Sequence, residues 1–211
     1  MRSDLGLTST QLSLYFPDIE GTRLVDKAKT HTTDIFPGKV SLVVMSSFRS
    51  SEVRRIYVHS WAELTLGGLQ EHINSFVRPA LSDMKDEGLF QYVYVRTSVS
   101  NSSTSNSLRR MGQINLQENP LKSFLVNMFL SSLRKTIPVE QQPTYLLSHQ
   151  SLEYLREPMG MQNKHVGYVF LVDWDRRIRW AGCSWATLDE EEALRKCSHV
   201  LVGRLKEISK M

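Results

Sequence analysis

Two long apolar runs constrain the fold of this chain more than any other feature. Residues 40–45, Val-Ser-Leu-Val-Val-Met, show no alternation of apolar and polar side chains, and residues 166–172 are similarly apolar. A strand with this pattern needs cover on both faces, as the central strands of a helix-covered sheet have. At 211 residues the chain can supply that cover, because a domain of this size buries roughly 70% of the surface of its unfolded form.

The remaining segments predict an alternation of helices and strands. Helices are expected over residues 64–85, 120–135 and 148–156 and after the capping box at residues 187–190, and a strand over residues 90–96. Pro79 should kink or split the first helix, and Pro120 suits the first turn of the second. Residues 177–181 alternate as a half-exposed strand that returns from a turn at residues 173–176.

The order strand, helix, strand, helix, hairpin, helix predicts the fold class. Helical crossovers imply parallel neighbours, and the tight hairpin implies an antiparallel edge pair. We therefore expect an α/β protein with a thioredoxin-like mixed sheet covered by helices. Residues 1–37 are expected to form an N-terminal extension of loops and turns, and residues 38–211 the thioredoxin-like domain.

The redox chemistry of that fold is not expected here. A thioredoxin-type site needs a thiolate at the start of the helix after the first core strand, but this strand runs into Met45, Ser46 and Ser47. The proline that faces the thiols is also missing, since residues 165–168 are His-Val-Gly-Tyr. Cys197 is expected to pack in the core, whereas Cys183 ends a strand and is the one candidate for a reactive thiol.

Composition excludes several other classes of protein. Twenty-six Lys and Arg against 22 Asp and Glu give a net charge of +4, and the excess is scattered, so no nucleic-acid partner is expected. No apolar run approaches the roughly 20 residues of a membrane span. The histidines and cysteines lack metal-ligand spacing, and we expect no cofactor or metal. The first residues, Met-Arg-Ser-Asp, match neither a signal peptide nor a transit peptide.

Two surfaces are candidates for binding a partner. The helix over residues 120–135 is apolar over a wide arc. This pattern fits a helix packed between the sheet and a loop, and alternatively it predicts that Phe124, Met128 and Phe129 form a surface that grips an apolar client. The hairpin combines tryptophan with arginine, as interface hot spots do. In its return strand Ile178 and Trp180 should face inward, and Arg177 and Arg179 should face solvent or a partner. The hairpin candidates are Arg177, Arg179 and Trp180.

Several segments together resemble the mitochondrial ATP synthase assembly factor ten family. They are residues 161–173, Met-Gln-Asn-Lys-His-Val-Gly-Tyr-Val-Phe-Leu-Val-Asp, residues 177–182, Arg-Ile-Arg-Trp-Ala-Gly, residues 15–24, which resemble the entry motif of the family, and the less specific residues 38–43. The family-motif residues are Asn163, Gly167, Tyr168, Asp173, Ile178, Arg179, Trp180, Ala181 and Gly182. The resemblance covers nearly the whole chain.

The resemblance implies a non-enzymatic chaperone on a thioredoxin-like domain. Its client would be subunit six (subunit a) of the Fo sector of ATP synthase, bound while that subunit is incorporated. It also implies a peripheral location at the matrix side of the mitochondrial inner membrane, no cofactor and no catalytic residue. Two alternatives stay open: a one-cysteine thiol oxidoreductase or peroxidase that uses Cys183, and an adaptor for a different membrane-protein client.

Overall fold

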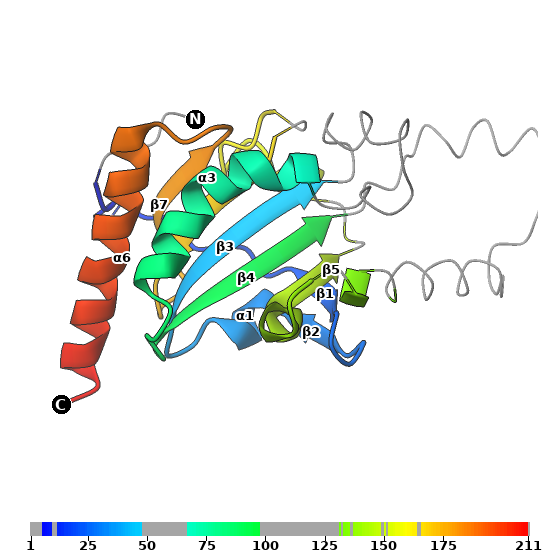
Figure 1. Cartoon of the computed structure of the whole chain (residues 1–211), viewed down its shortest axis with the longest axis horizontal. Helices are drawn as coiled ribbons and strands as arrows, with labels where there is room; N and C mark the ends of the chain where they lie inside the picture. Colours follow the sequence, from blue (N-terminus) through cyan, green and yellow to red (C-terminus); the bar gives the residue numbers. More distant parts are fainter. Residues whose placement is uncertain are drawn as a thin grey trace, which may run out of the picture.

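The first apolar run forms an inner strand of a seven-stranded sheet in the computed structural model of the chain (Figure 1). The structure describes residues 6–9, 12–47, 67–97, 131, 133–135, 137–148, 150, 152–163 and 166–210. The strands are β1 (Glu20–Arg23), β2 (Lys29–His31), β3 (Val40–Ser47), β4 (Phe90–Thr97), β5 (Tyr145–Ser148), β6 (Tyr168–Val172) and β7 (Ile178–Cys183). Their order across the sheet is β2-β1-β5-β4-β3-β6-β7.

The middle of this sheet has the predicted thioredoxin-like arrangement. Val43 of β3 lies opposite Val93 of the parallel strand β4 and opposite Phe170 of the antiparallel strand β6. Strand β7 pairs with β6 as the antiparallel edge. Helix α3 (Gly67–Asp83) connects β3 to β4, and helix α6 (Leu188–Ile208) follows the hairpin. The fold is therefore α/β with a mixed sheet, as the order of elements predicted.

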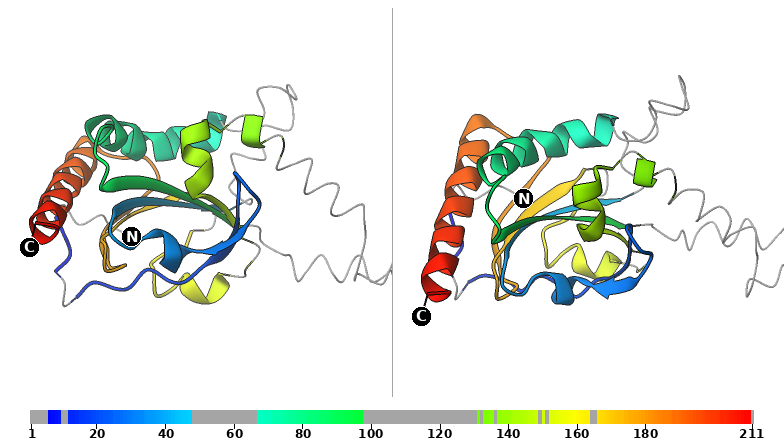
Figure 2. Two further views of the ribbon diagram at one scale, coloured as in Figure 1. Left: turned by 90° about the horizontal axis from the view of Figure 1, so that it is seen from below. Right: turned by 60° about the horizontal axis from the view of Figure 1, so that its bottom comes forward.

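Each face of the sheet has its own hydrophobic core. Leu42 and Val44 of β3 pack with α3 and α6 on one face, and Val43 on the other face packs with Phe16 and Phe36 from the N-terminal part of the chain. Figure 2 shows α3 on one side of the sheet and the N-terminal segment and the turn around residues 153–155 on the other. The apolar run of β3 is thus covered on both faces, which confirms the prediction from its pattern.

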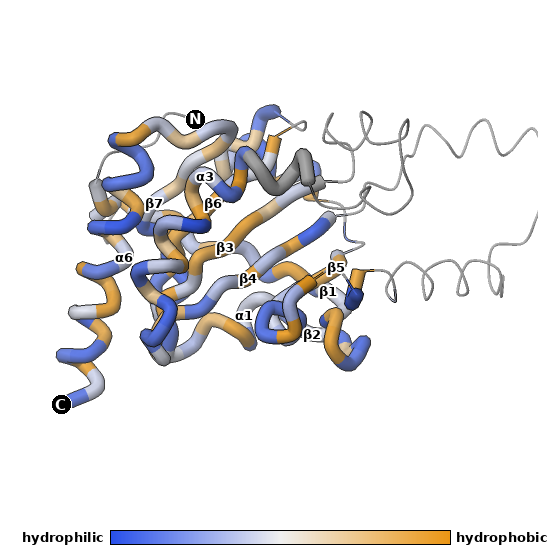
Figure 3. Tube along the Cα trace, in the orientation of Figure 1, coloured by the Kyte–Doolittle hydropathy of each residue, from blue (hydrophilic) through white to orange (hydrophobic). Residues whose placement is uncertain are grey.

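The two long helices follow their sequence signals. Thr187 accepts a hydrogen bond from the backbone nitrogen of Glu190, and the Glu190 carboxylate accepts one from the backbone nitrogen of Thr187, so the predicted capping box is present. Apolar and polar residues alternate along α6 as its single buried stripe requires (Figure 3). Pro79 lies inside α3 and does not split it. None of the helices in the described ranges has the length and apolar character of a bilayer span.

The prediction of a helix between β5 and β6 is wrong. Residues 148–156 were expected to form a helix, but Ser148 ends strand β5 and only the 3-10 helix η3 (Glu153–Leu155) lies in that range. The 3-10 helix η2 (Val139–Thr144) leads into β5, whose register beside β4 places Leu146 opposite Val95. This distant pairing, and not the local pattern, decides the conformation of β5.

The N-terminal 37 residues contain more structure than the expected loops and turns. They supply strands β1 and β2 and the short helix α1 (Thr32–Ile35). Thr22 of β1 lies opposite Leu147 of β5, so this part of the chain extends the same sheet. Both strands are short and polar, and local propensity alone gives little indication of them.

Candidate functional site

The hairpin between β6 and β7 begins with a turn built on Asp173. One carboxylate oxygen, Oδ1, accepts hydrogen bonds from the backbone nitrogens of Asp175 at 3.0 Å and Arg177 at 2.9 Å. Arg176 takes a positive φ of 67° in the same turn. Asp173 is 2% exposed and therefore acts as a structural turn residue, the role in which Asp is commonly found.

A bulge in β7 changes the direction of the next side chains. Leu171 lies opposite Trp180 and Val172 opposite Ile178, so Arg179 is an extra residue in the ladder. The prediction that Arg179 faces outward is wrong: its side chain is 7% exposed, and its Nη1 lies 3.0 Å from Oδ2 of Asp173. Because Ile178 and Trp180 are also buried, β7 is not the half-exposed strand that its alternation predicted.

The second cause of this burial is a segment that we call the N-terminal strap, residues 7–9 and 12–16, which lies along the outer edge of β7. Thr8 donates from its backbone nitrogen to the carbonyl of Arg179 at 2.7 Å and accepts from Nε of Arg179 at 2.9 Å. Further along, Ile178 donates its backbone N–H to the carbonyl of Leu14 at 2.8 Å. The strap therefore satisfies the edge of the sheet that the hairpin alone would leave open.

Arg177 holds the outer part of the strap. Its Nη2 donates to the hydroxyl of Tyr15 at 2.6 Å, and its guanidinium carbon lies 4.3 Å from the centre of the Tyr15 ring. Its Nη1 reaches the carbonyl of Ser13 at 3.4 Å. A cation above an aromatic ring adds stabilisation to these hydrogen bonds. The arginine that was expected to face solvent or a partner is half-buried and fastens the strap.

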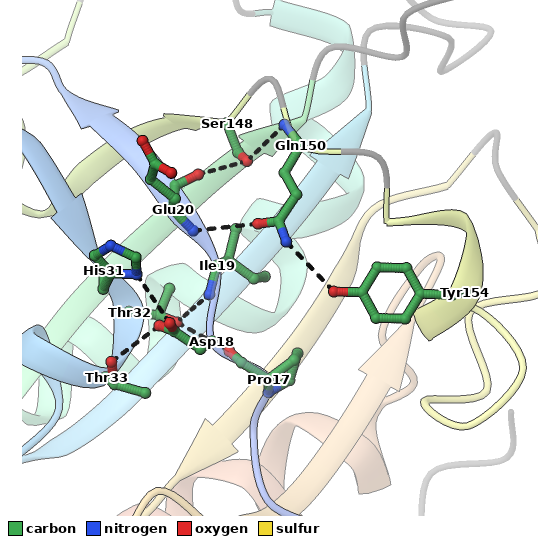
Figure 4. A network of polar contacts seen from close by, with 10 residues as sticks. All are labelled: Pro17, Asp18, Ile19, Glu20, His31, Thr32, Thr33, Ser148, Gln150 and Tyr154. Atoms are coloured by element: carbon green, nitrogen blue, oxygen red, sulfur yellow. Dashed lines mark hydrogen bonds and ion pairs between the residues drawn. The ribbon is translucent and has the colours of Figure 1, made fainter. Parts of the chain in front are cut away.

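A polar network holds residues 17–19, which connect the strap to β1 (Figure 4). Thr32 Oγ1 donates to the carbonyl of Pro17 and accepts from the backbone nitrogen of Ile19, each at 2.9 Å. His31 Nδ1 lies 2.8 Å from the Asp18 carboxylate, which also accepts from Thr33 Oγ1 at 2.9 Å. The hydrogen bonds from Thr33 and His31 hold the pKa of Asp18 below its ordinary value against the opposing effect of burial.

The same network connects the start of β1 to β5 and to the η3 turn. Ser148 Oγ donates to the carbonyl of Glu20 at 2.7 Å, and Gln150 Oε1 accepts from the backbone nitrogen of Glu20 at 3.3 Å. Gln150 in turn donates to the hydroxyl of Tyr154 at 3.4 Å. The motif at residues 15–24 therefore anchors the strap to β2, β5 and the η3 turn.

The strap, β7 and residues 157–160 enclose a groove of about 330 Å³. Apolar residues dominate its lining: Leu12, Leu14, Pro158, Met159, Phe170, Ile178 and Ala181. Leu12 is 79% exposed and Leu14 is 55% exposed, so two large apolar side chains stand at the surface beside one hollow. A gathering of this kind marks an interaction surface more often than isolated apolar residues do. We take this groove as the candidate functional site.

Trp180 also lies along the groove but does not present its ring there. The ring packs against Phe76 of α3 with centroids 5.6 Å apart, and the residue is 1% exposed. This confirms that Trp180 faces inward. A Cβ on Gly182 would lie 2.6 Å from the Trp180 ring, so that glycine leaves the space which the tryptophan fills. Gly182 thus leaves room for the Trp180 ring in the core, and the packing of that ring holds the part of β7 that lines the groove.

The remaining motif residues also have structural roles. Tyr168 donates from its hydroxyl to the carbonyl of Asn163 and accepts from its backbone nitrogen, both at 2.9 Å, while burial raises the pKa of Tyr168. A Cβ on Gly167 would lie 2.6 Å from Cδ1 of Ile73, so the backbone there passes close to α3. The other predicted partner surface, Phe124, Met128 and Phe129, lies outside the residues that the structure describes.

A small cavity lies at the end of β3. It measures about 50 Å³ and lies between the end of β3 and the start of β6, lined by residues that include Met45, Ser46 and Tyr168. Cys183 lies beside Tyr168 in the ladder and is half-buried, whereas Cys197 is buried in the core on the opposite face, where burial raises its pKa. Within the described ranges, no three His, Cys, Asp or Glu side chains gather as metal ligands would.

Comparison with known proteins identifies the family. The sequence profile of the family described as ATP10 protein matches residues 7–201, nearly the whole chain. The chain belongs to the ATP10 protein family. The matched range begins with the strap and includes the hairpin, so both walls of the groove lie within the part that the family shares.

Curated relatives of this ATP10 family chain come from fungi. The chain is 26% identical over 201 residues to the mitochondrial ATPase complex subunit ATP10 of Candida glabrata, covering 94% of this chain and 59% of the relative. It is 29% identical over 186 residues to the protein of the same name from Saccharomyces cerevisiae, covering 87% and 58%. The chain thus spans about three-fifths of the length of these relatives.

Solved structures similar to the chain include two proteins of other families. A thiol:disulfide interchange protein DsbE of Chlorobium tepidum is 12% identical with a TM-score of 0.45, covering 90% of this chain and 97% of that one. BsSco, a member of the Sco family of cytochrome c oxidase assembly proteins, is 11% identical with a TM-score of 0.45, covering 95% and 96%.

Proposed function

We propose that this chain is a non-enzymatic assembly chaperone for the Fo sector of mitochondrial ATP synthase, in peripheral contact with the matrix side of the inner membrane. Its client is an apolar segment of subunit six (subunit a), which it holds until the subunit is incorporated. Membership of the ATP10 family and the names of the curated relatives support the place and the process. The apolar groove beside Leu12 and Leu14 is the observation that carries the proposal.

The groove suits temporary capture of an apolar segment. Covering a large apolar side chain that stands in water contributes on the order of 1–2 kcal/mol, so the two leucines supply a modest affinity that a later partner can displace. The strap is already fastened by Thr8, Arg177 and Arg179, so little conformational freedom is lost on binding. A modest, preorganised apolar site is appropriate for a chaperone that must release its client.

The positions of the two cysteines support a function without dithiol chemistry. Residues 45–47, where β3 ends, are Met-Ser-Ser, so the helix after this strand is not preceded by a thiol. Cys183 and Cys197 pack against opposite faces of the sheet and are not joined in a disulfide. A dithiol reaction needs two sulfur atoms within bonding reach, and this arrangement separates them.

Capture of newly made mitochondrial proteins tests the proposal. Mitochondria that carry this chain in place of the resident protein would be labelled during translation, and the chain would be immunoprecipitated. We expect subunit a to be captured, and its recovery to fall several-fold for the pair Leu12→Ser and Leu14→Ser. The matched control is Val139→Ser with Leu188→Ser, which also removes two exposed apolar side chains, 73% and 85% exposed, but away from the groove.

Two results would contradict the proposal. Capture of a different membrane protein by the unaltered chain, with no subunit a, would show an adaptor for another client. Equal recovery of subunit a with the groove variant and with the control would show that subunit a binds to a different surface of the chain. In that case the pair Phe124→Ser and Phe129→Ser decides whether the helix predicted over residues 120–135 binds the client. The apolar part of the interaction should persist at high salt, because apolar contacts are not screened.

A further inference from the structure

One side chain at the groove differs in character from all the others. Glu157 is the single charged residue in its lining, and it is exposed next to Pro158 and Met159. Within the described part of the chain, no ion pair involves its carboxylate, although the nearby Glu153 pairs with Arg156 at 3.0 Å. A carboxylate beside an apolar hollow costs little in the free protein because water still reaches it.

The two arginines on either side of Ile178, which lines the groove, are engaged elsewhere. Arg179 is buried against Asp173 and Thr8, and the guanidinium of Arg177 lies over the Tyr15 ring on the strap. Neither residue lines the groove. The charge presented to an occupant of the groove is therefore negative, and it stands on a mainly apolar surface.

We infer that the groove binds an apolar segment that is followed directly by a basic residue, whose charge Glu157 recognises. This inference rests on the proposed function, because it assigns the chemistry of the client at the same site. Membrane-spanning segments commonly end in this way, with Lys or Arg following the apolar stretch on one side of the bilayer. The leucines of the groove cover the apolar end, and Glu157 sets the direction in which the segment lies.

A pair of labelled peptides tests this recognition with the whole chain in solution. Both carry the same block of leucines, and one ends the block with lysine where the other has glutamate. Fluorescence anisotropy should give a dissociation constant for the lysine peptide that is roughly two- to five-fold lower, the range expected for one exposed ion pair. Glu157→Gln should abolish the difference, and Glu157→Lys should reverse it. Glu140→Lys, an exposed position outside the groove, should leave it unchanged.

The peptide results distinguish a failure of the role of Glu157 from a failure of the proposed function. If both peptides bind equally and lose affinity together in the variant with Leu12→Ser and Leu14→Ser, the groove binds apolar segments but the role of Glu157 is overturned. If neither peptide binds, the proposed function fails at this site, and the inference fails with it. Competition by a free fatty acid, or a dimer that disappears in the leucine variant, would show that a lipid tail or a second copy of this chain is the occupant and overturn the inference.

Discussion

Arg179 and Asp173 form an ion pair at 3.0 Å in which the side chains are only 7% and 2% exposed. The pair connects the turn of the hairpin to the strap, because Arg179 also donates to the carbonyl of Thr8. Because both side chains are buried, each charge is compensated only by the other, and removing one leaves a buried charge without a partner. The architecture of the groove therefore depends on a charge pair that lies beneath it.

Removing one charge of this pair should be costly. We expect Asp173→Asn to lower the free energy of unfolding by about 3 kcal/mol, because it leaves Arg179 buried without a counter-charge. Adding Arg179→Met should restore part of the loss, and urea denaturation of the single and double variants measures the coupling. As a control, Lys196→Met breaks the exposed pair with Glu192 and should change stability little. Additive losses in the double variant would contradict this account.

Gly167 should tolerate no side chain. Its Cβ would lie 2.6 Å from Cδ1 and 2.8 Å from Cγ1 of Ile73, which is itself 3% exposed and has little room to move. We expect Gly167→Val to lower the free energy of unfolding by about 1–3 kcal/mol, and thermal unfolding measures it. Gly203 in α6 has open space around it, so Gly203→Ala should stabilise by roughly 0.5–1 kcal/mol.

A compensating change sharpens the test at Gly167. In the Gly167→Ala background, Ile73→Val removes the Cδ1 atom that the new Cβ would meet. The double variant should therefore lose less stability than the two single losses added together. A neutral Gly167→Val would show that β6 does not pass α3 as closely as its register implies.

The two cysteines should be dispensable for function but unequal for stability. Replacing Cys183 with Ser and Cys197 with Ala together should leave ATP synthase assembly largely intact, measured as assembled complex in native gels. Cys197→Ala alone should cost about 1 kcal/mol, because its sulfur is buried in the core on the α3 and α6 face of the sheet, and replacing the half-buried Cys183 should cost less. Loss of assembly in a double variant that still folds would restore the thiol oxidoreductase as an alternative.

The contact between α3 and α6 should depend on pH. Asp83 accepts from Nε of Arg195 at 2.6 Å and from Nη2 at 3.1 Å, and these hydrogen bonds hold its pKa below the ordinary value of 3.8. A depressed carboxyl pKa contributes stability that is fully present above about pH 4 and is lost as the pH falls through the lower value of the folded state.

Comparison with a variant isolates this contribution. Arg195→Gln should be less stable than the unaltered chain at pH 7, and the gap should narrow below the ordinary Asp pKa of 3.8 as Asp83 is protonated in both proteins. Urea denaturation at several pH values measures the gap. Arg204→Gln, with no ion pair among the described residues, is the control. A gap of constant size down to pH 2 would show that the pair does not act through Asp83 ionisation.

Local patterns determined the central elements of this protein. The apolar runs at residues 40–45 and 166–172 identified β3 and β6 as strands covered on both faces, and the capping box at residues 187–190 identified the start of α6. These signals depend on burial and hydrogen bonding within a few residues, so they can be read without the fold. The missing thiol after β3 is equally a property of the sequence, as is the resemblance that the ATP10 family match confirmed.

Tertiary structure decided where the groove lies. Strand β5 exists because β4 lies beside it, and β1 because β5 does; neither carries a strong pattern of its own. Alternation predicted an outward Arg179, but the bulge gives β7 one more residue than its partner strand. The hydrogen bond from Arg179 to Thr8 joins residues 171 positions apart. No local pattern reports contacts over such a separation, because their free energy is gained only when the whole sheet has assembled.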